Sequence, residues 1–333
     1  MNIVQYLFLI PFVFNLTAVS HHSDIDNDGL DDQFEQLILE RFVPTWMLSE
    51  KECDRLPAEF YPGKQVPQLL AQNGTIYGQV FPLDLSGRSG VYIEVHYYHL
   101  WNRDCGLNGH PLDVEHVSVL LSADALVDSV SEWNAECWYA AAHEDTVCDA
   151  SHAARSSSLN AVRWGPTVWI SAGKHASFLD KSLCGGSCGS DDCSEMSPIE
   201  ISKIVNLGEP GVPMNGVSWA QWSGWPLGGK METDFPETVL AKLYVAEMPE
   251  VIPVNDSRSP VKTTVRVGTS SAGAMIRTNN KTNSALSSAS GAVGASLNKS
   301  KDGVCNFLIR AARGTWRLLG GGNDINSKTG ERR

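Results

Sequence analysis

The sequence has no hydrophobic run long enough to cross a membrane as a helix, because no segment reaches the roughly 20 apolar residues that a bilayer requires. It also has no serine-nucleophile elbow, no zinc-protease helix and no phosphate-binding loop, so the familiar hydrolase and nucleotide-binding signatures find no support. There is no internal repeat. The helix–strand alternation that indicates a parallel α/β sheet is absent as well.

The first 20 residues contain no charged side chain. An apolar stretch runs from Ile10 to Phe14, and Ala18 and Ser20 occupy the −3 and −1 positions of a cleavage site. We therefore predict a signal peptide at residues 1–20 and a secreted, extracellular protein; an uncleaved N-terminal anchor is the alternative. Acceptor patterns for N-glycosylation, which predict a glycoprotein in a glycosylating source, begin at Asn73, Asn255, Asn280 and Asn298.

The chain has eight cysteines, and an even number in an exported protein predicts disulfide bonds. Cys137 and Cys148 flank a short polar segment and could close it as a loop. Three further cysteines lie in a Gly-, Ser- and Asp-rich loop that either pairs within itself or reaches an earlier cysteine: Cys184, Cys188 and Cys193, with Cys53 or Cys105 as the distant partners. A zinc site in this loop is the competing interpretation.

Charge divides the chain into two parts. The net charge is −12, yet from Lys262 onward twelve basic residues face three acidic ones. Residues 261–303 are mostly Ser, Ala, Gly, Thr and Asn, which predicts a flexible linker. Residues 304–333 form a basic tail, amphipathic from Cys305 to Leu319, that either contacts an anionic membrane surface or a partner or docks as a helix on the acidic body.

An EF-hand-like calcium loop is predicted directly after the signal peptide, within residues 21–48. Carboxylates fall at positions one, three, five, nine and twelve with glycine at six, so hard oxygen ligands surround one ion. The ligands are Asp24, Asp26, Asp28, Leu30 through its backbone, Asp32 and Glu35. A helix should follow and end before Pro44, because Phe34, Ile38 and Phe42 recur at helical spacing. We interpret the loop as a structural calcium clip rather than a sensor.

Residues 49–260 are predicted to form a mainly β domain, an antiparallel β-sandwich with long loops. Short runs rich in β-branched and aromatic residues alternate there with Gly, Asn, Asp and Pro. The clearest strands span residues 91–98, 114–121, 137–142 and 167–171.

Four potential metal ligands lie in the eight residues from Gly109 to His116. Asp113 and Glu115 share one face of a strand, and His110 lies in the turn before it, an arrangement that suits Ca²⁺ or Mg²⁺. His116 points to the other face, where a core hydrogen bond is expected. Other candidates have two readings each: His143 and His175 as site-edge or buried histidines, and Trp219, Trp222 and Trp225 as a ligand platform or a core cap.

These motifs resemble two families. The order Trp101 to Asp104, then Gly109 to Val119, is similar to the Gly-His-Arg-His-Asp-Trp-Glu core of the necrosis- and ethylene-inducing-peptide-like proteins. Further segments resemble the vacuolar protein sorting 62 family: Arg41 to Pro44, Leu56 to Phe60, Cys137 to His143 and Ser171 to Phe178.

The resemblance implies a β-sandwich that carries a divalent cation at one end, covering residues 40 to 235. Carried over position by position, its metal-site residues are Asp104, His110, Asp113 and Glu115, with His175 as a neighbour. The sequence departs from the family pattern at Leu112 and at Val114, which replaces a tryptophan. For this reason plant-toxin activity is not carried over.

Two functions remain for this cluster, and a binding protein is preferred to an enzyme. In the first, the cation bridges a glycan, a lipid head group or another anionic ligand. In the second, a hydrolase of phosphoester or glycosidic bonds, Glu115 or His175 is the general base and Lys174 stabilises developing charge. A secreted protein whose metals only stabilise it is a third interpretation. We expect no nucleic-acid partner.

Overall fold

A computed structural model describes residues 23–85, 87–106, 109–144, 146, 148–184, 191–225, 227, 230–244 and 251–254. Several predicted segments lie outside these described residues. They are the signal peptide at residues 1–20, the linker at 261–303 and the tail at 304–333, together with residues 255–260 just before the linker. Neither described α-helix has the length and apolar character needed to cross a membrane.

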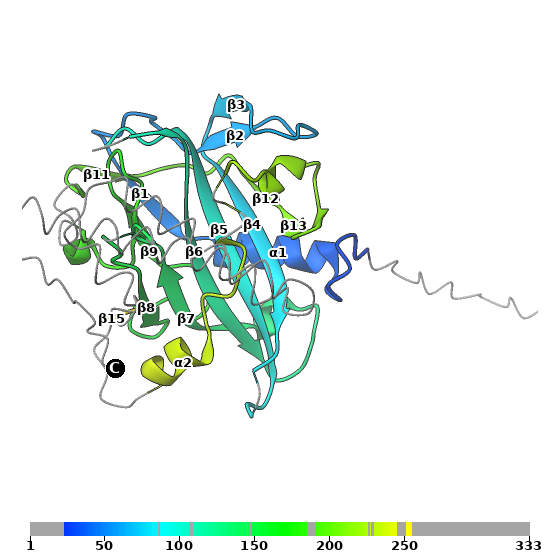
Figure 1. Cartoon of the computed structure of the whole chain (residues 1–333). Coiled ribbons are helices and arrows are strands. Elements are labelled where there is room, and N and C mark those ends of the chain that lie inside the picture. The colour runs from blue at the N-terminus through cyan, green and yellow to red at the C-terminus, as the bar shows by residue number, and fades with distance from the viewer. Residues whose placement is uncertain are drawn as a thin grey trace, which may run out of the picture. The chain divides into compact units, whose positions relative to one another are not determined.

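The described residues are mainly β, as predicted (Figure 1). The α-helices are α1 (Asp32–Phe42) and α2 (Glu237–Leu243), and short 3₁₀ turns span Val130–Glu132, Lys181–Leu183 and Ser218–Gln221. The strands are β1 (Thr45–Ser49), β2 (Ala58–Phe60), β3 (Leu69–Gln72), β4 (Thr75–Leu83), β5 (Val91–Arg103), β6 (Pro111–Ala123), β7 (Asn134–Ala140), β8 (His152–Arg155), β9 (Thr167–Ile170), β10 (Ser177–Phe178), β11 (Met196–Pro198), β12 (Lys203–Asn206), β13 (Gly208–Glu209), β14 (Val212–Pro213) and β15 (Val251–Pro253).

Two larger sheets organise these strands. The seven-stranded sheet has the order β12-β4-β5-β6-β7-β8-β15, and the four-stranded sheet has the order β10-β9-β1-β11. Neighbours from β4 to β15 pair antiparallel, whereas β12 pairs parallel with β4 and β1 pairs parallel with β9. The prediction of purely antiparallel pairing is therefore wrong at two places. Both parallel partners are far apart in sequence, so no tight hairpin fixes their direction.

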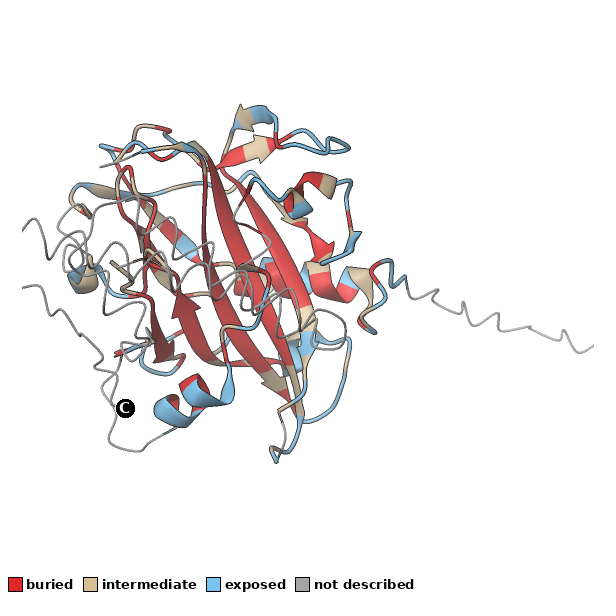
Figure 2. Ribbon diagram, in the orientation of Figure 1, coloured by how far each residue is buried: buried red, intermediate tan, exposed pale blue. Residues whose placement is uncertain are grey.

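The main core lies between the two sheets and beside α1. One cluster of buried residues combines Trp46 and Ile170 of the small sheet with Tyr97 and Val119 of the large one, and includes Ile38 of α1. The opposite face of the large sheet is also covered, as the continuous buried colour of its central strands indicates (Figure 2). A strand buried on both faces must place its polar residues against specific partners.

Helix α1 begins at Asp32, within the predicted calcium loop, and ends before Pro44 as the sequence predicts. The Asp31 side chain caps it by accepting hydrogen bonds from the backbone N–H groups of Gln33 and Phe34. Its inner side packs closely on β4, where Gly78 leaves room for Leu39; a Cβ at Gly78 would overlap that side chain. This packing fixes the predicted calcium loop, which leads into α1, against the large sheet.

Disulfides join Cys53 to Cys105 and Cys184 to Cys193. The second bond confirms that the Gly-rich loop pairs within itself, and it removes these two thiolates from any zinc site there. Pairing of Cys137 with Cys148 is wrong, because Cys137 is a buried free cysteine in β7, whereas Cys148 is disulfide-bonded. Cys137 lies among apolar side chains between β6 and α2, where it acts as a small core residue.

Candidate metal and ligand sites

The N-terminal loop brings several of its acidic side chains close together. Ligand oxygens of Asp24, Asp26 and Asp28 lie within 4.8 Å of one another, and so do those of Asp26, Asp32 and Glu35. Asn27 and Gly29 adopt positive φ values of 65° and 95°, which turn the backbone tightly around this point. Asp26 belongs to both groups and therefore lies at the centre of the carboxylates.

Backbone groups hold the loop in this shape. Asp24 accepts hydrogen bonds from the N–H of Asp28 at 3.1 Å and of Gly29 at 3.2 Å, and Asp32 accepts one from Ile25 at 2.9 Å. Leu30, whose carbonyl is the predicted backbone ligand, buries its side chain in the main core. The Leu30 side chain thus anchors the loop to the main core.

The central carboxylates have buried oxygens that no described protein group satisfies. Both oxygens of Asp26 and one oxygen of Glu35 are buried without a hydrogen-bond partner. Burial, with the nearby Asp28 carboxylate, raises the pKa of Asp26 to about 6, and burial with repulsion from Asp26 raises the pKa of Glu35 to about 9. Orphaned, mutually repelling oxygens of this kind fit a divalent cation.

Two further residues interact with the loop carboxylates, and the sequence pattern does not reveal either of them. Asn206, at the end of β12, donates a hydrogen bond of 3.0 Å to Glu35. Burial raises the pKa of Glu209 in β13 to about 7, and repulsion from Asp28 and Asp26 adds to the shift. Both residues come from a segment far along the chain, so no local motif could have identified them.

The second predicted site lies where β5 ends and β6 begins. Asp104 follows β5, His110 precedes β6, and Asp113 and Glu115 occupy alternate positions of β6. Gly109 is essential to this turn, since a Cβ there would overlap the carbonyl oxygen of Asp104. The sequence pattern therefore placed all four residues at one end of the same hairpin.

Each carboxylate at this end has a basic partner. Asp104 contacts Lys174 at 2.8 Å and His110 at 3.7 Å. Asp113 bonds to Nδ1 of His175 at 2.9 Å. Lys174 and His175 both belong to the turn between β9 and β10, which the resemblance had indicated as a neighbour of the site.

Glu115 has a different partner. Its carboxylate contacts Nζ of Lys230 at 3.2 Å, and the same nitrogen contacts Glu144 at 3.2 Å. Burial raises the pKa of Glu115, and Lys230 opposes this shift. Burial alone would lower the pKa of Lys230, but Glu115 and Glu144 raise it instead. Lys230 is therefore a fixed cation between two carboxylates.

His175 is held between two acids. Its Nε2 lies 3.3 Å from Glu52, opposite the bond to Asp113, and its ring stacks on Trp101 with 4.0 Å between centroids. Burial alone would lower its pKa, but hydrogen bonds to Asp113 and Glu52 raise the pKa to about 9. Burial alone would raise the pKa of Asp113, and the bond to His175 lowers it to about 2. At neutral pH the pair is ionised.

The second site fits a metal less tightly than the loop. Among the described residues, no three of Asp104, His110, Asp113 and Glu115 bring their ligand atoms within 4.8 Å of one another. The donor types nevertheless suit a hard cation, and five carboxylates meet only three strongly basic groups here. The acids are Glu52, Asp104, Asp113, Glu115 and Glu144; the bases are Lys174, His175 and Lys230.

Sequence reasoning missed several members of this cluster. Glu52, Glu144 and Lys230 stand outside every motif, and only tertiary contacts bring them to β6. The cysteines are the only sequence feature that points to Glu52. Glu52 directly precedes Cys53, and the disulfide joins Cys53 to Cys105, the residue that follows Asp104. His143 bonds to Asp191 at 2.9 Å and also interacts electrostatically with Glu115.

The tryptophan triplet is mostly a core element. Trp219 and Trp225 are buried and pack against Phe60 and Tyr77, whereas Trp222 is half-buried. Only Trp222 retains surface for a ligand. The platform interpretation therefore does not describe the triplet as a whole.

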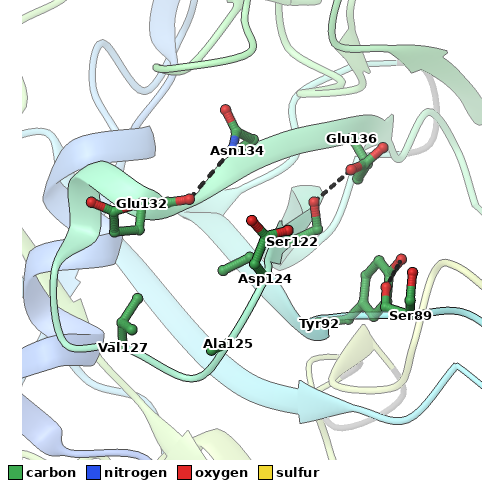
Figure 3. A pocket seen from close by; sticks show the side chains of 10 residues that line it. Ser89, Tyr92, Ser122, Asp124, Ala125, Val127, Glu132, Asn134 and Glu136 are labelled. Atoms are coloured by element: carbon green, nitrogen blue, oxygen red, sulfur yellow. Dashed lines mark hydrogen bonds between the residues drawn. The ribbon is translucent and has the colours of Figure 1, made fainter.

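A cavity of about 350 Å³ lies at the opposite end of β5 and β6 (Figure 3). Its lining includes the carboxylates of Asp124, Glu132 and Glu136, and none of the lining residues is basic. Ser122 donates to Glu136 at 2.5 Å, so one of these acids is already bound. The predicted site residues do not line this cavity.

No family model matches the sequence, and no curated protein matches it either. Several solved structures are similar in part. "Toxin fold for microbial attack and plant defense" is 15% identical with a TM-score of 0.32, covering 52% of this chain and 74% of that chain. "NLPPya in complex with glucosamine" is 13% identical with a TM-score of 0.33, covering 57% and 78%.

A third similar structure is Necrosis and Ethylene inducing Protein 2 from the causal agent of cocoa's witches' broom disease. It is 12% identical with a TM-score of 0.31, and the match covers 66% of this chain and 94% of that chain. These neighbours belong to the necrosis- and ethylene-inducing side of the resemblance, and none of the three supports the vacuolar protein sorting 62 side. At such low values we draw no functional conclusion from them.

Proposed function

We propose that this chain is a secreted β-sandwich protein, stabilised by calcium in its N-terminal loop, that binds an anionic or polyhydroxylated ligand through a divalent cation at the β5–β6 edge. The ligand class is a glycan, a lipid head group or another anion. The loop ion is Ca²⁺, because its predicted ligands are all oxygens. The edge ion is Ca²⁺ or Mg²⁺, because three of its four predicted ligands, Asp104, Asp113 and Glu115, are carboxylates.

The observation that carries the proposal is the charge imbalance at the edge. The five carboxylates named above exceed the three bases by the charge of one divalent cation. Asp113 and Glu115 are buried and interact electrostatically, so a cation that joins them lowers their repulsion. His110, whose side chain is 40% exposed, would leave the ion open to solvent and to a ligand on that side.

The hydrolase alternative receives less support from the geometry. A general base must be unprotonated at the working pH, whereas the hydrogen bonds to Asp113 and Glu52 raise the pKa of His175 to about 9. Glu115, the other candidate base, is bound to Lys230. A binding role requires neither residue to accept a proton.

The test compares the wild-type chain with an Asp113→Asn/Glu115→Gln variant and with Asp26→Asn as a matched control. Equilibrium dialysis with Ca²⁺ and Mg²⁺ counts the bound ions, and a glycan array and vesicles containing anionic lipid measure ligand binding with and without each cation. We expect the double variant to lose one ion and at least tenfold of the cation-dependent binding. Asp26→Asn should lose the loop ion and keep the ligand.

Two results would contradict the proposal. A folded double variant that retains both ions and the same ligand affinity would show that Asp113 and Glu115 do not form a metal site. A wild-type chain that binds calcium in the loop but engages neither glycans nor anionic vesicles supports the third interpretation, in which the metal only stabilises the protein.

A further inference from the structure

A separate histidine cluster lies on the face of the large sheet that points away from the small sheet. His96 in β5 and His116 in β6 are diagonal neighbours, because the strand register pairs Tyr98 with His116. Asp234, in the segment before α2, contacts both rings. Both histidine side chains are fully buried, and that of Asp234 is 9% exposed.

The segment from Lys230 to Phe235 covers this face. The Tyr98 hydroxyl donates to the carbonyl of Lys230 at 3.0 Å, and Glu94 accepts hydrogen bonds from the Thr233 hydroxyl at 2.6 Å and the Asp234 N–H at 2.7 Å. Figure 1 shows the chain ahead of α2 running across the large sheet. The cluster is therefore enclosed between the sheet and its cover.

The three donor atoms converge on one point. Oδ2 of Asp234 lies 2.8 Å from Nε2 of His116 and 3.8 Å from Nδ1 of His96, and each of the three residues offers one ligand atom within 4.8 Å of those of the other two. Two ligands of a tetrahedral zinc ion, each about 2.1 Å from the metal, are about 3.4 Å apart. The observed separations lie on either side of this value.

The hydrogen bonds of His96 support a cation between these atoms. With its proton on Nε2, His96 donates a hydrogen bond of 2.8 Å to Glu94. Nδ1 is buried without a hydrogen-bond partner and, in that tautomer, directs a lone pair towards the Asp234 carboxylate. A cation between them converts this repulsion into attraction. A carboxylate behind a metal-binding histidine is the usual arrangement that orients such a ligand.

We propose that His96 Nδ1, His116 Nε2 and the Asp234 carboxylate bind a transition-metal ion of the zinc type. Two imidazoles and one carboxylate are the ligand set that such ions prefer, whereas Ca²⁺ and Mg²⁺ prefer oxygen. The site differs in chemistry and position from the calcium loop and from the β5–β6 edge. It does not depend on the ligand-binding function proposed above.

The ion would tie the 230–235 cover to the sheet. Lys230 begins this cover, and its Nζ bridges Glu115 and Glu144 at the edge site. Removing the ion should therefore loosen Lys230 as well as α2, which follows directly. The site is structural in this view, since its donors are enclosed rather than open to a substrate.

The experiment uses the full chain, stripped of metal and then saturated with Ca²⁺ so that oxygen-rich sites are filled. Zn²⁺ is titrated by isothermal calorimetry, and bound zinc is counted by elemental analysis. We expect one equivalent per chain. His116→Gln and Asp234→Asn should weaken the zinc affinity at least 100-fold, and Glu94→Gln, which acts through His96, about 10–100-fold.

His152→Gln is the matched control, because His152 is also buried but bonds to the carbonyl of Ala150 and to the N–H of Leu179 instead. Its zinc affinity should equal that of the wild type. Co²⁺ substitution in the unmodified chain gives a second measurement that needs no variant: the visible absorption of bound Co²⁺ should disappear as one equivalent of Zn²⁺ is added. No zinc binding by the wild type, or equal affinity in His116→Gln and Asp234→Asn, would overturn the proposal.

Discussion

Removing calcium from the N-terminal loop should destabilise the protein by an amount that the structure sets. Asp26 is 3% exposed, and burial together with repulsion from Asp28 raises its pKa from 3.8 to about 6. The unfolded chain returns this carboxyl to its ordinary pKa. A shift of roughly two units corresponds to about 3 kcal/mol, which the metal-free folded state carries at neutral pH.

The pH dependence has a definite sign. A carboxyl whose pKa is raised in the folded state binds its proton more tightly there, so metal-free stability is highest at low pH and falls as the pH rises. Asp26 produces this fall between about pH 4 and pH 6. Glu35, whose pKa is raised to about 9, continues it towards pH 9. Bound calcium compensates both charges and should remove most of the slope.

Thermal unfolding followed by circular dichroism measures the effect, in Ca²⁺ and in a calcium chelator, at pH 5 and pH 7. About 3 kcal/mol corresponds to roughly 6–12 °C in a domain of this size, so the Tm should fall by that amount at pH 7 and by less at pH 5. Asp26→Asn should reduce the calcium effect, whereas Asp84→Asn, an exposed acid after β4, should not. Equal Tm values with and without calcium at pH 7 would refute the reasoning.

Two other perturbations test the framework around the edge site. Replacing Cys53 and Cys105 by serine opens a bond between residues 52 positions apart, and loop entropy predicts a loss of about 4 kcal/mol, measurable by urea unfolding; an unchanged midpoint would contradict this. Gly109→Ala places a Cβ on the Asp104 carbonyl oxygen and should cost about 1–3 kcal/mol through overpacking, with loss of the edge cation; a variant as stable as wild type with full cation binding would show that the turn adapts.

Local sequence patterns predicted the local parts of the fold. The helical spacing of Phe34, Ile38 and Phe42 and the breaker Pro44 located α1, and the β-branched and aromatic runs located β5, β6, β7 and β9. Pairing between strands or cysteines far apart in the sequence was harder to predict. Nothing in the sequence of β1 indicates that it lies parallel to β9, and nothing in the sequence around Cys137 shows that it is a free cysteine buried in the core.

The candidate sites show the same division. The alternation of Asp113 and Glu115 placed both on one face of β6, as the strand period requires. Their partners could not be predicted, because Lys230 and Glu144 reach Glu115 from separate loops. No sequence pattern predicts a site at His96, since its relation to His116 and Asp234 depends on the register of β5 and β6 and on the later segment that covers them.

The hydrogen bond from Asn206 to Glu35 joins residues 171 positions apart. During synthesis, the acidic loop therefore leaves the ribosome long before the strand that secures its last carboxylate. Contacts of such long sequence separation form late, after the intervening strands have paired. If calcium is captured only when Glu35 is fixed, this loop becomes ordered later than the strands that are synthesised after it, and ion binding is one of the last steps in folding of the domain.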